Sequence, residues 1–134
     1  MIEQISIFAE NKKGAMQDIT SVIADAGINI ESLVTNDSAE FGIIRMLVDD
    51  ADKAAQCLKD AGYLVHVDNV ICVEMTDSPG GLNSLLCDIK TGNINLDYIY
   101  ISYNRQSSVP LAIIKAQDAS EVEMCIKGYG HKVR

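Results

Sequence analysis

The sequence has no tryptophan, only two prolines and no long apolar run. Its longest uninterrupted apolar stretches are four residues, such as Val70–Val73, whereas a membrane-spanning helix needs about 20. The first residues also lack the basic and apolar regions of a signal peptide. We therefore expect a cytoplasmic protein without a membrane anchor.

Basic residues are also scarce, because 11 Lys and Arg face 19 Asp and Glu, for a net charge of −8. The basic residues are scattered along the chain and form no stripe. Nucleic-acid binding draws its affinity from Lys and Arg placed on phosphates, and an anionic lipid surface attracts the same residues. We therefore expect neither a nucleic acid nor a membrane as the partner.

Motifs of catalysis and metal binding are missing as well. The four cysteines form no C-x-x-C pair, which argues against a zinc knuckle or a dithiol redox site. The two histidines, His66 and His131, have no catalytic or metal-ligand spacing and are expected to be structural or solvated. Core packing explains Cys57 and Cys125, while Cys87 lies off the apolar face of its helix. The sequence predicts no enzyme activity, no cofactor and no metal.

The chain repeats itself at an offset of 66 residues in its first part and 68 further on. The second copy has therefore gained two residues, and we place them near residues 105–109. We predict two tandem modules, residues 1–68 and 69–134. The aligned ranges are 5–9 with 71–75, 11–16 with 77–82, 27–31 with 93–97, and 50–62 with 118–130.

Each module alternates strand and helix periodicities. In the first module, residues 4–9 alternate as a half-buried strand does, and Gly14 opens a helix that Gly27 ends in a left-handed cap. Residues 36–38 predict a turn, and Gly62 ends a second helix that starts at Asp49–Asp50. The inward positions of the helices are Met16, Ile19, Ile23 and Ala26, then Ala51, Ala54, Ala55, Leu58 and Ala61. The further strands are predicted at 28–34, 41–48, 63–67, 94–103 and 111–116, with residues 71–75 as the separate first strand of module two.

This order is the α+β, ferredoxin-like βαββαβ plan in two tandem copies, packed as a pseudo-symmetric pair. Helices cover one face of each antiparallel sheet, and modules this small need cover on the other face. Only residues 131–134 remain for the last strand. That strand is either very short or replaced at its edge by a neighbouring chain.

The loop between the first strand and first helix of module two, residues 77–82, could bind a ligand. Ser78 is predicted as the N-cap and Pro79 as the first helical residue. The glycines allow close backbone approach, and free N–H groups at the positive end of a helix can hold a carboxylate. Asp77 could meet an ammonium group. On its own, the loop is more typical of an ordinary capped helix start.

Asn29 and Asn95 begin the second strand of each module, at the same point of the repeat. Asn at a strand start is usually a turn residue. Its recurrence indicates a second role, since the side-chain amide there could contact a ligand near one end of the sheet.

The pattern of a strand, [N/D]-x-P-G-x-L, a helix and G-x-N-I-x-S-L resembles the ACT domain. Module one, with Gly14 and residues 27–33, is similar to the ACT domain of acetolactate synthase regulatory subunits. Module two resembles the ACT modules of aspartate kinases through Asp77, Pro79, Gly80 and Leu82. The resemblance covers nearly the whole chain.

ACT domains sense small molecules, usually free amino acids, at module interfaces near the first loop and the start of the second strand. The resemblance therefore implies a non-catalytic regulatory protein that binds a free amino acid, functions as a homodimer and has two candidate sites. The contacts implied in module one are Asn11, Gly14, Ala15, Met16, Asn29 and Ile30. Those implied in module two are Asp77, Pro79, Gly80, Gly81, Leu82, Asn95 and Leu96.

Module one departs from the family pattern, because Lys13 stands in place of Pro and Asn11 in place of an acidic residue. Lys12 and Lys13 could instead attract an additional carboxylate, and binding could be confined to one of the two modules. An alternative function also stays open. The chain could be the regulatory subunit of an amino-acid biosynthetic enzyme and act mainly through protein contacts.

Overall fold

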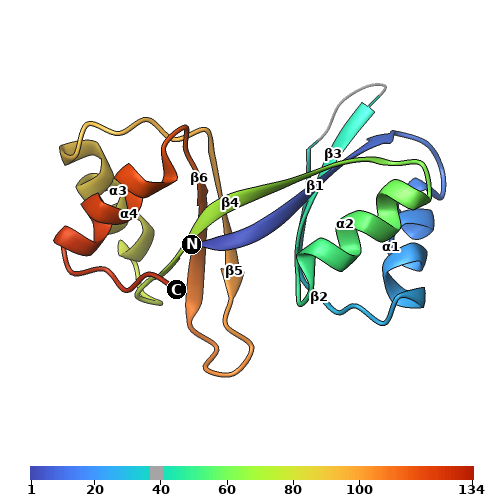
Figure 1. Cartoon of the computed structure of the whole chain (residues 1–134). Helices are drawn as coiled ribbons and strands as arrows, with labels where there is room; N and C mark the ends of the chain where they lie inside the picture. The colour runs from blue at the N-terminus through green and yellow to red at the C-terminus, as the bar shows by residue number, and fades with distance from the viewer. Residues whose placement is uncertain (37–40) are drawn as a thin grey trace. The chain divides into compact units, whose positions relative to one another are not determined.

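The computed structural model describes residues 1–36 and 41–134, so the turn predicted at Asp37 and Ser38 lies outside the described residues. The chain divides into two compact units, which we call the N-terminal unit, Glu3–Asp68, and the C-terminal unit, Asn69–Arg134 with Met1–Ile2. Each follows the predicted βαββαβ plan, so the ferredoxin-like fold class is confirmed (Figure 1). The elements are β1 (Ile2–Glu10), α1 (Ala15–Asp25), β2 (Ile30–Asn36), β3 (Phe41–Val48), α2 (Ala51–Asp60), β4 (Leu64–Glu74), α3 (Gly81–Thr91), β5 (Tyr98–Tyr103), β6 (Pro110–Lys115) and α4 (Ala119–Gly128).

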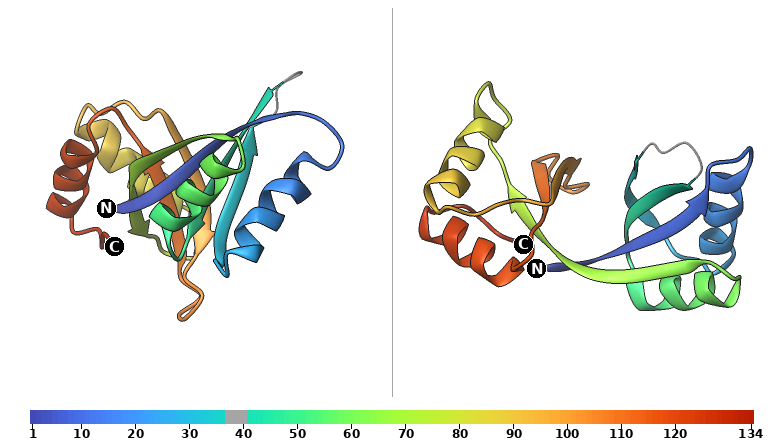
Figure 2. Two further views of the ribbon diagram at one scale, coloured as in Figure 1. Left: turned by 45° about the vertical axis from the view of Figure 1, so that its right-hand side comes forward. Right: turned by 90° about the horizontal axis from the view of Figure 1, so that it is seen from above.

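In the N-terminal unit the strands lie in the order β2-β3-β1-β4. Strands β1 and β3 pair antiparallel with Ile7 opposite Ile44, and β2 pairs with β3 with Thr35 opposite Ile44. Helices α1 and α2 lie together on one face of these strands (Figure 2). The core between the two layers includes Ile19 and Leu58, both fully buried, as the apolar helix positions predict.

The C-terminal unit repeats the arrangement, with strand order β4-β6-β5 and helices α3 and α4. Val133 forms an isolated antiparallel bridge with Val73 of β4. Backbone N–H groups on both sides strengthen it, because Glu74 donates to Lys132 O at 2.9 Å and Arg134 donates to Cys72 O at 2.7 Å. Of the two alternatives left open for the last strand, the structure has the very short one.

Strand β4 corrects one prediction. The sequence predicted separate strands at 63–67 and 71–75, but residues 64–74 form one continuous strand. This stretch contains neither Gly nor Pro, and β-branched residues occur on both sides of Asp68–Asn69. Strand propensity therefore runs through the polar pair without a break.

Both second strands also start later than predicted, at Ile30 and Tyr98 instead of residues 28 and 94. The cause is the way the preceding helices end. Ile28 N–H donates to Ile23 O at 3.2 Å, and Ile94 N–H donates to Ile89 O at 3.3 Å, so these amides close a helix instead of joining a ladder.

All four helices end in this Schellman motif, with a residue in the left-handed conformation after the C-cap. The bend predicted at Gly27 is confirmed, and Asn93 adopts the same conformation in module two. Ala61, predicted to face inward, is instead the exposed C-cap of α2, because the helix ends at Asp60. The left-handed residues that follow the helix C-caps are Gly27 (φ 72°), Gly62 (φ 95°), Asn93 (φ 56°) and Gly130 (φ 85°).

Among residues 1–36 and 41–134, the structure has no helix that is both long and apolar enough to cross a membrane.

Candidate functional site

The loop from β1 to α1 is a type II turn. Ala15 N–H donates to Lys12 O at 3.2 Å, and Gly14 has φ 84° and ψ −5°. A type II turn requires a positive φ at its third residue, which explains the glycine. Lys13 occupies the second position, where proline is common but not required. The turn therefore forms in module one despite the departure from the family pattern.

The matching loop in module two corrects the predicted cap. Gly81 N–H donates to Ser78 O at 3.0 Å, and Gly80, with φ 86° and ψ −1°, is the N-cap of α3. Ser78 is therefore the first residue of a type II turn and Pro79 the second, because proline presets the φ of that position. Gly81 is required for a different reason, since a Cβ there would lie 2.1 Å from Thr76 O.

The start of α1 and the start of α3 differ from the other two helix starts. Asp50 accepts a hydrogen bond from Lys53 N–H at the start of α2, and Asp118 accepts one from Glu121 N–H at the start of α4. In the described part of the chain, no side chain caps α1 or α3. Ala15 and Gly81 donate their N–H groups within the turns, so the N–H groups of the next two helical residues and the positive end of the helix dipole are available to an anion.

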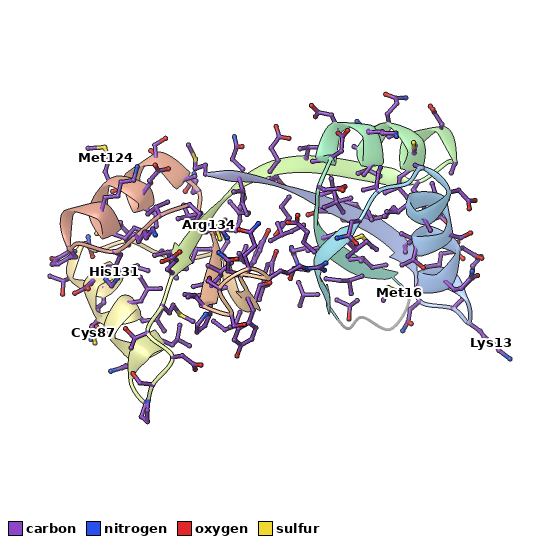
Figure 3. All side chains as sticks on the ribbon, turned by 90° about the horizontal axis from the view of Figure 1, so that it is seen from below. Lys13, Met16, Cys87, Met124, His131 and Arg134 are labelled. Carbon is purple, nitrogen blue, oxygen red and sulfur yellow. The ribbon has the colours of Figure 1, made fainter. Side chains whose placement is uncertain are left out.

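A cavity of about 150 Å³ lies beside the α1 loop in the N-terminal unit. Three of the predicted contact residues, Asn11, Ala15 and Met16, line it on the loop and helix side. Met16, expected on the buried face of α1, is 39% exposed because it belongs to the first turn and borders this cavity (Figure 3). Gly14 shapes the turn, and its Cα faces open space.

The cavity also has two polar groups that the sequence reasoning missed, from Glu10 and Thr35, and one that it named as a possible carboxylate partner, from Lys12. Glu10 lines it together with Lys12, and the Lys12 Nζ lies 3.5 Å from a Glu10 carboxylate oxygen. Both side chains are exposed, 62% for Glu10 and 65% for Lys12. Thr35 lines the cavity from β2. Lys13 extends away from the unit (Figure 3), so it is Lys12 that provides the positive charge.

Asn29 and Ile30 do not line this cavity. They border a separate groove of about 500 Å³ along α1, with Gln17 and Thr20. The reason is the length of α1, since 11 helical residues put its two ends about 16 Å apart. Asn29 is fixed through its backbone, because its N–H donates to Asp49 Oδ1 at 3.1 Å and its carbonyl accepts from Asp49 N–H at 3.2 Å.

In module two the predicted residues divide in the same way. Asp77, Pro79 and Gly80 are exposed, and Leu82 is 38% exposed at the start of α3. Residues 95–96 lie at the other end of the helix. There Asn95 and Leu96 border a groove of about 370 Å³ with Leu86, Ile89 and Lys90. Neither unit by itself brings the two predicted groups of residues together.

Histidine and cysteine side chains make structural contacts. His131 Nε2 lies 2.6 Å from Asp88 Oδ2, which ties the segment after α4 to α3. The His66 ring meets Phe8 edge to face at 5.8 Å. Cys87 is exposed, as the helix pattern predicted (Figure 3). Within residues 1–36 and 41–134, no three His, Cys, Asp or Glu residues gather in a way that could hold a metal ion.

Comparison with known proteins identifies related sequences and folds. The family described as an ACT domain pair matches residues 1–125. A solved protein from Bacteroides thetaiotaomicron is 30% identical, with 98% of this chain and 90% of that chain covered and a TM-score of 0.91. The regulatory subunit of aspartate kinase from Thermus thermophilus shares the fold at 16% identity, 94% and 91% coverage and a TM-score of 0.66. None of the curated protein sequences matches this chain.

Proposed function

Because the chain belongs to the ACT domain pair family, we propose that it is a non-catalytic regulatory protein that binds a free amino acid beside the β1–α1 loop of its N-terminal unit. The observation that carries this proposal is the cavity of about 150 Å³ whose lining includes one carboxylate, from Glu10, and one ammonium group, from Lys12. An amino-acid zwitterion carries an ammonium group that can pair with Glu10 and a carboxylate that can pair with Lys12.

In this proposal each end of such a ligand has a partner. The α-carboxylate lies against Lys12 and the N–H groups of the second and third residues of α1, where no side chain competes within the described residues. The α-ammonium lies against the Glu10 carboxylate, which takes the role that the family pattern gives to an acid at the Asn11 position. Charge-assisted hydrogen bonds of this kind contribute about 1.5–3 kcal/mol each.

The expected affinity is modest. Both charged side chains are more than half exposed, so solvent and salt screen their attraction for the ligand. We expect a dissociation constant roughly between 1 μM and 1 mM. Raising the salt concentration should weaken binding for the same reason.

Thermal melting of the purified full chain against each of the twenty amino acids at millimolar concentration tests the proposal. A ligand at 100 times its dissociation constant adds about 2.7 kcal/mol, enough to raise the melting temperature by several degrees. Lys12→Gln and Glu10→Gln should each reduce the shift. Lys13→Gln is the matched control, because this neighbouring side chain extends away from the unit, and it should keep the shift.

Absence of a shift with all twenty amino acids would remove the amino-acid proposal. A second candidate function would then stand, that of a regulatory subunit acting through contacts with a biosynthetic enzyme. It is supported by the match in length, since the chain corresponds to 91% of the Thermus thermophilus regulatory subunit. Co-sedimentation with a candidate enzyme, in the presence and absence of its end product, would test this second function.

A further inference from the structure

The sheet side of the cavity includes two very small residues, Ala9 and Gly42. Ala9 of β1 lies opposite Gly42 of β3, and both line the cavity. On the neighbouring ladder Thr35 lies opposite Ile44, and they line it too. Because opposite residues on paired strands point to the same face, these four positions form one wall.

Strand register identifies the same wall in the C-terminal unit. There Met75 occupies the place of Ala9, and Pro110 the place of Gly42, with Met75 N–H donating to Pro110 O at 2.9 Å. Met75 packs against the core of its unit, and Pro110 is buried. Two larger side chains therefore occupy space at the positions where module one has a methyl group and a hydrogen.

The pairing of β2 with β3, and of β5 with β6, shows a further difference between the two walls. Ile101 lies opposite Ala112 in module two, where Thr35 lies opposite Ile44 in module one. The Ile44-to-Ala112 exchange removes volume, but the Thr35-to-Ile101 exchange adds it and replaces a hydroxyl with an alkyl group. Thr76 also replaces Glu10 at the strand end. The wall in module two is thus bulkier overall and lacks the carboxylate.

We propose that only the N-terminal module binds the amino acid, because Ala9 and Gly42 leave room beside its loop where Met75 and Pro110 fill the matching wall of module two. This inference rests on the proposed function and deepens it. Glu10 and Lys12 line the same cavity as Ala9 and Gly42, so the charged groups and the wall of small residues face one ligand.

This assignment reverses the expectation from the motifs. The D-x-P-G-G-L loop of module two matches the family pattern better, yet Met75 and Pro110 occupy the wall beneath it. The loop of module one departs from the pattern, yet its wall leaves space. Loop sequence controls the turn, whereas strand residues control the room for a ligand.

Isothermal titration of the full chain with glycine, alanine, serine, threonine, valine, leucine and phenylalanine measures the stoichiometry of binding. One site per chain is expected for each amino acid that binds. Two sites per chain would overturn the inference while leaving the proposed function intact. No binding of any amino acid would instead remove the proposed function.

The decisive variant is Ala9→Met, which gives module one the side chain that module two has. It should weaken binding at least tenfold, and its melting temperature should stay close to that of the wild type because the side chain enters existing space. Ala54→Met is the matched control, since Ala54 is fully buried in the same core, and overpacking there costs about 1–3 kcal/mol. Unchanged affinity in Ala9→Met, or a loss of stability equal to that of Ala54→Met, would contradict the inference.

Discussion

Replacing Gly81 by alanine should destabilise the C-terminal unit through a single steric contact. Gly81 is the first residue of α3, and a Cβ there would lie 2.1 Å from Thr76 O and 3.2 Å from Thr76 C. Its φ is not in the left-handed range, so the conformation itself suits alanine. Gly128, the last residue of α4, provides the control, because a Cβ there meets no atom within 4 Å.

The magnitude follows from how far the backbone must move. An ordinary contact needs more than 3 Å, so the start of α3 and Thr76 must separate by about 1 Å. Overpacking of this kind costs about 1–3 kcal/mol, and loss of glycine flexibility in the unfolded chain returns about 0.4–1 kcal/mol. We expect Gly81→Ala to lower the free energy of unfolding by about 1–2 kcal/mol. Gly128→Ala should raise it by about 0.5–1 kcal/mol.

Urea unfolding followed by circular dichroism would measure both variants, and an unchanged m-value would show that the unfolded state is not the cause. For a unit of this size, a loss of about 1–2 kcal/mol lowers the melting temperature by roughly 4–16 °C. A Gly81→Ala variant as stable as Gly128→Ala would refute the reasoning. The backbone around the Thr76 carbonyl would then move without an energetic cost. The short distance from a Cβ to Thr76 O would not explain why position 81 is a glycine.

Two further predictions concern titrating groups. Cys87 is exposed and should react first with a thiol reagent at about pH 8, whereas Cys72 should react only on unfolding. The reason is that burial raises the pKa of the Cys72 thiol and limits access to it. Labelling of both cysteines at one rate, measured by mass spectrometry, would contradict this prediction. The hydrogen bond from Lys127 lowers the pKa of Glu123, so this carboxylate stabilises the fold at neutral pH and ceases to do so as the pH falls below about 4.3. Glu123→Gln should flatten the dependence of stability on pH in that range, and a wild-type acid profile in the variant would count against the assignment.

Local signals made most of the fold predictable. The helix of module one needed only Ile19 and Ile23 at helical spacing and Gly27 at its end, and the structure places all three as expected. The length of β4 was not predictable in this way. Asp68–Asn69 reads as a turn in isolation because both residue types are common in turns, whereas the β-branched residues on either side continue the strand through the pair.

The candidate site was predictable only in part. Asn11, Ala15 and Met16 lie within six consecutive residues, so the sequence alone placed them together. Glu10 could have been found by searching one residue upstream for the missing acid. Thr35 and Gly42 come from other strands, and their position depends on register, which a single sequence does not reveal.

The left-handed residues beside the helices recur between the two modules. Gly27 and Asn93 share a position and a conformation, and so do Gly14 and Gly80. Ala9 and Met75, at equivalent points of a strand, differ in size. Backbone geometry limits which residues can bend the chain, whereas a position on the face of a sheet accepts side chains of different volume. The two halves can therefore share one architecture and still present different surfaces beside their first loops.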